Sequence, residues 1–238
     1  MSMKILGIDI GSVSVHVLGI KIQDNAKNHH IFLREKAAHN GEVKLALTAL
    51  LDRCDLKDIS HVAATDCTPA FVGVQARIDH QVALIRSAKY LHSTPFAGVL
   101  NVGGESFSLS LFDSMGSYTG ARHNTSCAAG TGSFLDQQAG RLQLKDSAQI
   151  SDLAIANTRA RPDIATRCAV FAKTDLIHAQ QEGYDIEQIC DGLCFGLAKN
   201  IANTLFKKQL HDGPIIFCGG VSQNLAVINH LKVIIGRN

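Results

Sequence analysis

The chain has no tryptophan, and aromatic residues make up only 5% of its 238 residues. Proteins that bind single-stranded nucleic acid stack the bases on aromatic side chains, so such a binding platform is not expected here. The net charge of +2 also gives no strong positive field for a phosphate backbone or an anionic lipid surface. We therefore expect neither a nucleic acid nor a membrane as a partner.

Long hydrophobic runs are missing as well. No segment approaches the ~20 apolar residues that are needed to span a bilayer. The opening residues MSMKILGIDIG reach an acidic residue at Asp9, which indicates a strand rather than a signal peptide. The 7 cysteines are scattered, odd in number and without a C-x-x-C pair, so a disulfide framework is not expected and a cytoplasmic location is favoured.

What is present is an α/β pattern with an internal repeat. Strands are expected at 4–10 and 13–22, with a tight turn between them, and again at 98–102 and 106–113. Aligning the two pairs places Asn101, 92 positions further on, where Asp9 stands in the first pair. This match indicates an internal duplication. The alternative is two ordinary hairpins that agree by coincidence.

The other expected elements follow from apolar periodicity and from capping residues. Asn40 is expected to cap a helix that contains Leu45, Leu47 and Leu50. Further strands are expected at 31–37, 59–65, 214–218 and 232–235, and further helices at 79–91, 186–207 and 225–231. No closing helix is expected after 232–235, so the C-terminal part reads as truncated.

Three glycine turns each follow a predicted strand, at 11–12, 103–104 and 219–220. Glycine lets backbone N–H groups approach phosphate oxygens without an intervening side chain. The chain has no P-loop motif, and residues 130–132 do not open a dinucleotide fingerprint. The interpretation that remains is a nucleotide held by two turns, with Asp9 binding Mg²⁺ through water. Each turn taken alone is also compatible with a plain hairpin.

Cys127 precedes a small-residue turn and a predicted helix whose apolar residues are Leu135, Ala139 and Leu142. A thiol at a helix N-terminus is stabilised as the thiolate, which is the nucleophile and the metal ligand. Cys168 is a possible partner, and a metal site that needs about four ligands would then require a symmetric dimer. The alternatives are a phosphate-binding turn, or two unconnected core cysteines. Cys190 and Cys194, four apart on a predicted helix, are interpreted as packing residues.

The order of DIGS, GG, CAAGTG, RCAVFAKTD and GGVSQN resembles the activator component of 2-hydroxyacyl-CoA dehydratases and benzoyl-CoA reductases. These CoA-substrate-specific activases belong to the superfamily of acetate and sugar kinases, chaperones and actin. The resemblance covers nearly the whole chain. It implies a duplicated ribonuclease H-like α/β fold with two subdomains, 1–97 and 98–238, around a nucleotide cleft. The segment NTSCAAGTGSFLDQQ resembles long fused proteins that carry activase domains more than it resembles the short stand-alone activator.

The resemblance also implies cofactors and partners. Family members bind ATP or ADP with Mg²⁺ and share one [4Fe-4S] cluster across a homodimer, for which the matching ligands are Cys127 and Cys168. They use ATP hydrolysis to pass one electron from ferredoxin or flavodoxin to an acyl-CoA dehydratase or reductase. The matching nucleotide-site residues are Asp9, Gly11, Ser12, Val13, Ser14, Asn101, Gly103, Gly104, Glu105, Gly130, Thr131, Gly132, Gly219, Gly220, Gln223 and Asn224.

Three departures from the family pattern bear on catalysis. Asn101 stands where the second phosphate motif usually has aspartate, and an amide cannot accept a proton as a carboxylate does. Glu105 is the nearby carboxylate that can compensate, so Asp9, Asn101 and Glu105 are the catalytic candidates. Val13 replaces a hydroxyl residue and His16 a lysine. Two alternatives follow: a non-hydrolysing ATP-binding regulatory module of a larger protein, or a small-molecule kinase of the same superfamily.

Overall fold

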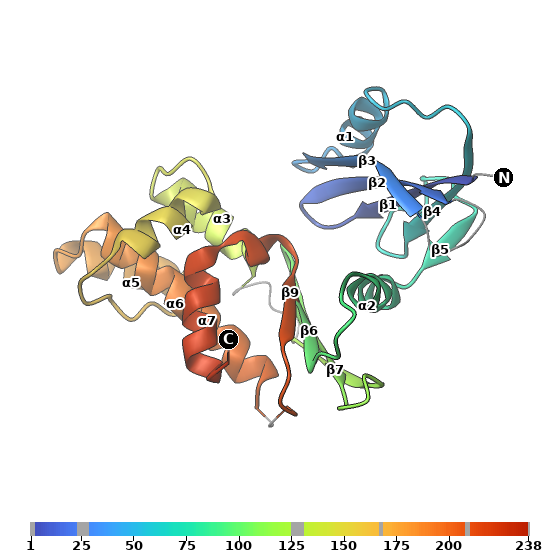
Figure 1. The fold of residues 1–238 in the computed structure, drawn as a ribbon. Coiled ribbons are helices and arrows are strands. Elements are labelled where there is room, and N and C mark those ends of the chain that lie inside the picture. The colour runs from blue at the N-terminus through green and yellow to red at the C-terminus, as the bar shows by residue number, and fades with distance from the viewer. Residues whose placement is uncertain (1–2, 23–28, 125–130, 167–168, 208–209, 238) are drawn as a thin grey trace. The chain divides into compact units, whose positions relative to one another are not determined.

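The computed structural model describes residues 3–22, 29–124, 131–166, 169–207 and 210–237. The chain forms two compact units, Met1–Leu91 and His92–Asn238, each built on its own mixed β-sheet (Figure 1). The predicted subdomain ranges, 1–97 and 98–238, stay a prediction. Each unit is described by itself.

The first unit contains a five-stranded sheet of order β3-β2-β1-β4-β5. Its elements are β1 (Met3–Ile10), β2 (Ser14–Ile22), β3 (His29–Ala38), α1 (Val43–Leu51), β4 (Ile59–Thr65), β5 (Ala76–Ile78) and α2 (His80–Leu91). Because side chains alternate along a strand, Leu6, Ile8 and Ile10 of β1 enter one core with Leu47 and Leu50 of α1. Asp9 therefore lies on the opposite face of the sheet.

The second unit contains a four-stranded sheet of order β8-β7-β6-β9. Its elements are β6 (Gly98–Val102), β7 (Phe107–Phe112), β8 (Tyr118–His123), α3 (Gly132–Arg141), α4 (Ser147–Ala156), α5 (Ala169–Gln181), α6 (Ile186–Leu205), β9 (Ile215–Cys218), the 3₁₀ turn η1 (Gly220–Gln223) and α7 (Leu225–Ile235). The helices gather on one side of this sheet (Figure 1). Leu193, Leu197 and Ile201 of α6 are completely buried in the core.

The two sheets repeat one topology. In each, three successive strands form an antiparallel meander, and the fourth lies parallel to the first. Asp9 and Asn101 both occupy the position before the last residue of the first strand. The predicted internal duplication is therefore confirmed.

Two local predictions are wrong. The expected strand at 232–235 is instead the last turn of α7, which ends at Gly236 with a left-handed φ of 63°. Short runs of valine and isoleucine fit a strand or a buried helix equally well, and here the capped helix prevails. Asn40 does not cap α1: its φ of 46° places it in a turn, and α1 begins only at Val43.

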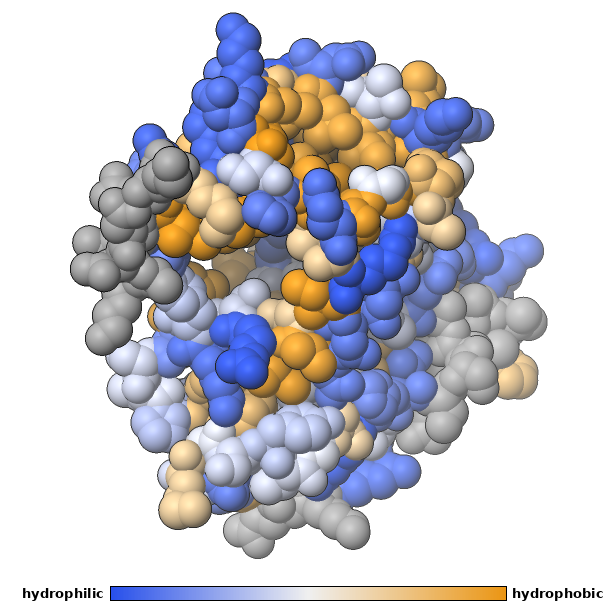
Figure 2. Space-filling model, turned by 90° about the vertical axis from the view of Figure 1, so that its right-hand side faces the viewer, coloured by the Kyte–Doolittle hydropathy of each residue, from blue (hydrophilic) through white to orange (hydrophobic). Residues whose placement is uncertain are grey.

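Hydrophobic side chains also reach the surface, in several places on the face drawn in Figure 2. In the first unit the exposed large hydrophobic residues include Leu45, Phe71 and Leu91. Exposed apolar side chains are normal on a folded protein. Among the described helices, none is both long and apolar enough to cross a membrane.

Candidate nucleotide-binding turns and cysteine segments

The first predicted phosphate turn joins β1 to β2. It is closed by a hydrogen bond of 3.1 Å from the Gly11 N–H to the Ser14 carbonyl. His39, the residue after β3, holds the turn from one side. Its ring nitrogen Nε2 contacts the Gly11 carbonyl at 3.1 Å, and its N–H donates to the Val13 carbonyl at 3.1 Å. Gly11, Ser12 and Val13 are exposed, so their backbone is accessible to a ligand.

Asp9 precedes this turn and lies next to the end of β4. The carboxyl ends of parallel strands meet at one edge of a sheet, and the Thr65 hydroxyl there donates to Asp9 Oδ1 at 2.7 Å. His80 Nδ1 of α2 lies 3.5 Å from the same oxygen. Burial raises the pKa of Asp9, but the hydrogen bonds from His80 and Thr65 outweigh it, so the pKa is lowered. Asp9 is thus ionised at neutral pH, as a ligand of Mg²⁺-bound water requires.

His16 pairs with Asp9 across β1 and β2. Its Nε2 lies 2.8 Å from the Ser14 hydroxyl. Burial lowers the pKa of His16, and the charge of Lys36 adds to this shift. A cavity of about 300 Å³ opens beside these groups, lined among others by Asp9, His16, Thr65, Arg34, Gly7, Leu18 and Ala63. Asp9, His16 and Thr65 therefore share one cavity within the first unit.

The second predicted phosphate turn repeats the first. The Gly103 N–H donates to the Ser106 carbonyl at 2.9 Å. The N-terminus of α3 braces this turn, because the Gly132 N–H donates to Gly103 at 2.9 Å and the Thr131 hydroxyl to Gly104 at 2.5 Å. The N–H of Gly132 is therefore already bonded inside the protein, and Thr131 is fully buried. Gly130, also a predicted binding residue, lies outside the described part of the chain.

Asn101 and the predicted adenosine motif meet at the carboxyl ends of β6 and β9. Gly219 has a φ of 86°, and a Cβ placed on it would lie 2.3 Å from the Val102 carbonyl oxygen and 2.7 Å from Asn101 Oδ1. Only glycine fits this contact. Glu105, the third catalytic candidate, is exposed beyond the turn.

The remaining residues of the adenosine motif fall into two groups. Gly219, Gly220 and Gln223 are exposed and accessible to a ligand. Asn224 is buried, and its Oδ1 accepts the Val227 N–H at 2.9 Å as the cap of α7. Its side chain therefore has a structural role in addition to the predicted one.

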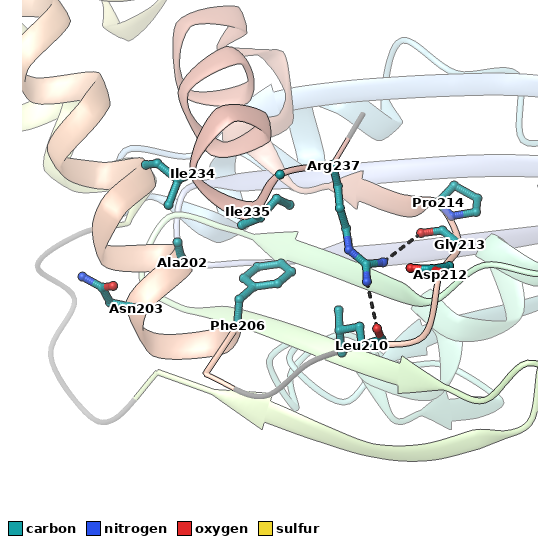
Figure 3. A pocket seen from close by; sticks show the side chains of 11 residues that line it. Ala202, Asn203, Phe206, Leu210, Asp212, Gly213, Pro214, Ile234, Ile235 and Arg237 are labelled. Carbon is teal, nitrogen blue, oxygen red and sulfur yellow. Dashed lines mark hydrogen bonds between the residues drawn. The ribbon is translucent and has the colours of Figure 1, made fainter.

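A separate pocket of about 660 Å³ lies in the second unit, between the end of α6 and the end of α7 (Figure 3). Arg237 crosses it and donates to the carbonyls of Leu210 and Gly213, at 2.9 and 3.1 Å. The guanidinium is thus engaged by the main chain that leads into β9. None of the predicted site residues lines this pocket.

Sequence reasoning missed three residues of the turns: His39, Thr65 and His80. Thr65 ends a predicted strand, so its position at the sheet edge beside Asp9 was a usable signal. His39 stands directly before the Asn40–Gly41 pair, which is a strong turn signal. Nothing in the sequence around His80 marks its contact with Asp9.

The predicted cluster ligands Cys127 and Cys168 lie outside the described residues. Burial raises the pKa of every cysteine that the structure describes, to about 12 for Cys190 and Cys218. A raised pKa disfavours the thiolate in these side chains. Cys190 and Cys194 are fully buried in the core, as predicted. No group of three or more His, Cys, Asp or Glu side chains that can hold a metal occurs among the described residues. The predicted ligands Cys127 and Cys168 would supply thiolate, which is the donor that an iron–sulfur cluster takes.

Residues 165 and 166, which precede Cys168 in the sequence, are hydrogen-bonded to α5 and α6. The Thr166 hydroxyl donates to the Gly196 carbonyl of α6 at 2.7 Å, and the Ala165 N–H to Asp175 Oδ2 of α5 at 2.8 Å. A Cβ on Gly196 would lie 2.6 Å from the Thr166 methyl carbon, so this glycine permits the close approach. These contacts hold residues 165 and 166 against α5 and α6.

Together, the repeated sheet and its two strand–turn–strand units define the duplicated α/β fold of actin-like ATPases and sugar kinases, as predicted. The activator of 2-hydroxyisocaproyl-CoA dehydratase from Clostridium difficile, solved with bound ADPNP, has this fold. It superposes with a TM-score of 0.82 over 100% of this chain and 87% of that chain, at 21% identity. The profile of the BadF/BadG/BcrA/BcrD ATPase family matches residues 6–238, so the chain belongs to this family.

Two curated relatives are similar in sequence. The 2-hydroxyisocaproyl-CoA dehydratase activator of Clostridioides difficile is 28% identical over 130 residues, 55% of this chain. The match spans about half of that relative's length, 48%. A benzoyl-CoA reductase component from Thauera aromatica is 25% identical over 233 residues, which cover 95% of this chain and 81% of that protein.

Proposed function

We propose that this chain is an ATP-dependent activator that passes one electron to an acyl-CoA dehydratase or reductase. The names of its relatives, an activator of one such dehydratase and a component of one such reductase, support this class of partner. The observation that carries the proposal is the pair of equivalent turns, each closed by the same backbone hydrogen bond and each preceded by a polar side chain. We infer a cytoplasmic homodimer, with ferredoxin or flavodoxin as the electron donor.

Different residues of the chain bind the phosphates, the adenosine, Mg²⁺ and the cluster. The turns 11–14 and 103–105 bind the phosphates through backbone N–H groups other than those of Gly11 and Gly103, which close the turns, and residues 219–223 bind the adenosine. Asp9 holds Mg²⁺ through water, and Asn101 orients the attacking water, with Glu105 as the nearby carboxylate. Cys127 and Cys168 of both protomers would hold a [4Fe-4S] cluster, which would supply one-electron redox chemistry when bound. ATP binding changes the exposure of that site only if the two conformations bind ATP with different affinity.

Anaerobic reconstitution with iron and sulfide tests the electron-transfer role. Absorption and EPR spectra are recorded for the wild-type chain, for Cys127→Ser and for Cys67→Ser, which removes an exposed thiol elsewhere as a matched control. We expect about four iron atoms per dimer in the wild type and in the control, and none in Cys127→Ser. The proposal is refuted if the wild-type chain takes up no cluster, or if Cys127→Ser takes it up equally well.

A second candidate function is favoured by Asn101. An amide at this position positions water without accepting its proton, so the chain would bind ATP without turnover and regulate neighbouring domains. Measuring ATP affinity beside ATP hydrolysis separates the two functions. Tight binding without hydrolysis supports the regulatory module, and sustained hydrolysis supports the activator.

A further inference from the structure

The first phosphate turn depends on a side chain that neither the sequence motifs nor the comparisons assign. We propose that His39 is a positioning residue that fixes the Gly11–Ser12 peptide, so that the Ser12 N–H points towards the nucleotide phosphates. This inference rests on the proposed binding of ATP. His39 itself does not touch the ligand.

The contacts of His39 fix its tautomer. The Gly41 N–H donates to His39 Nδ1 at 3.1 Å, so the ring proton resides on Nε2, which donates to the Gly11 carbonyl at 3.1 Å. A tight turn brings Gly41 back onto the ring. Asn40 and Gly41 both have positive φ, 46° and 87°, and the Glu42 N–H donates to the His39 carbonyl at 2.7 Å. This is the arrangement that an Asn-Gly pair favours.

Peptide geometry carries the effect of this bond to the next residue. In a planar trans peptide, the carbonyl of one residue and the N–H of the following residue point in opposite directions. A hydrogen bond that fixes the Gly11 carbonyl therefore also fixes the direction of the Ser12 N–H. His39 is 8% exposed, so its ring is packed in place and water competes little for the bond.

The equivalent turn of the second unit supports this role, because its glycine carbonyl is also hydrogen-bonded, but by a different donor. Gly103 stands 92 positions after Gly11 in the duplicated turn, and its carbonyl is also fixed, by the Gly132 N–H of α3 at 2.9 Å. In the described first unit no N–H of a helix N-terminus is recorded as donating to the Gly11 carbonyl, and the His39 side chain bonds it instead. The same carbonyl is thus bonded in both copies, once by a main-chain donor and once by an imidazole.

Two variants of His39 test the proposal. His39→Gln keeps a donor at the same distance along the side chain, whereas His39→Leu removes it. We expect His39→Leu to bind ATP about tenfold more weakly, which corresponds to ~1.4 kcal/mol, and His39→Gln to bind within about twofold of the wild type. Adenosine, which lacks phosphates, is expected to bind all three chains equally, as measured by calorimetry.

The controls separate positioning from folding. Far-UV circular dichroism and thermal unfolding check that each variant is folded. In case His39→Leu does not fold, the ring of the wild-type chain is examined at pH 8 by ¹⁵N NMR, where a proton on Nε2 supports the proposal. A proton on Nδ1, or a folded His39→Leu chain that binds ATP like the wild type, overturns it. A wild-type chain that binds no ATP overturns the proposed function instead, and His39 with it.

Discussion

Gly219 gives the sharpest test of how the second half of the candidate site is built. Its backbone, with φ 86° and ψ 174°, lies in a region that only glycine readily adopts. A Cβ there would also lie 2.3 Å from the Val102 carbonyl oxygen and 2.7 Å from Asn101 Oδ1. Since the first of these neighbours is backbone, no side-chain rotation relieves the contact.

The cost of Gly219→Ala follows from these two effects. The backbone conformation costs roughly 1–3 kcal/mol for a residue with a Cβ. Overpacking against fixed atoms adds about 1–3 kcal/mol. We therefore expect a loss of about 4 kcal/mol, a large share of the ~5–15 kcal/mol that stabilises a typical domain. The neighbouring variant Gly220→Ala is the matched control, because its Cβ meets nothing within 4 Å and its φ is not positive.

Urea unfolding followed by far-UV circular dichroism measures the difference between the two variants. Gly220→Ala is expected to unfold within about 0.5 kcal/mol of the wild type. Gly219→Ala is expected to unfold at clearly lower urea and to bind ATP at least about tenfold more weakly, since Asn101 must move. Equal stability of the two variants would refute the close contact of residue 219 with β6.

Three further predictions concern other parts of the site. The Asp9 pKa is lowered and the His80 pKa is raised, so this pair stabilises the fold above the unfolded pKa of aspartate and below that of histidine. His80→Gln should therefore lower the free energy of unfolding by less than about 1 kcal/mol near pH 5, because both side chains are partly exposed. The loss should shrink as the pH rises past 6.5, where His80 loses its charge. Unfolding measured as a function of pH tests this, and a constant difference across the range contradicts the ion pair. Asn101→Asp should raise ATP turnover about a hundredfold at unchanged ATP affinity, and unchanged turnover in a phosphate-release assay would contradict a missing base. Gly196→Ala should destabilise the second unit by about 2 kcal/mol and change the rate at which the Cys168 thiol reacts with a thiol reagent, whereas Gly140→Ala, whose Cβ meets nothing within 4 Å, should do neither.

Much of the fold was predictable because its central strands carry clear patterns. The strands β4 and β6 were predicted with their observed ends, and the repeat of strand–turn–strand units revealed the duplication. Other elements carry too little pattern to be predicted. The edge strand β8 (YTGARH) has no apolar alternation, and α5 spreads its apolar residues around the helix, with Phe171 64% exposed.

The candidate site was predictable only where a motif is local in sequence. Turns are marked by their own glycines, so the three predicted turns do follow strands in the structure. The groups that hold these turns come from far along the chain. Thr65 is 56 residues from Asp9, and His39 is 28 residues from Gly11. Thr65 reaches Asp9 because β4 pairs with β1, and the His39 ring reaches Gly11 because the turn at 40–41 orients it. A sequence motif with fixed spacing does not predict either contact.

The two phosphate turns differ in the segments to which they are hydrogen-bonded. Within the described residues, the second turn is bonded to Thr131 and Gly132, four and five positions after Cys127, through the Thr131 hydroxyl and the Gly132 N–H. If phosphates move the second turn, these bonds transmit the movement towards Cys127, whereas His39 ties the first turn to β3 alone. We expect ATP to change the reactivity of the Cys127 thiol in the cluster-free wild-type chain and in Thr131→Ser, which keeps the hydroxyl. In Thr131→Val the change should fall by about half or more, because one neutral hydrogen bond contributes ~1 kcal/mol. An ATP effect that persists at full size in Thr131→Val, with ATP affinity intact, would show that the turn and the cysteine segment are coupled by another route.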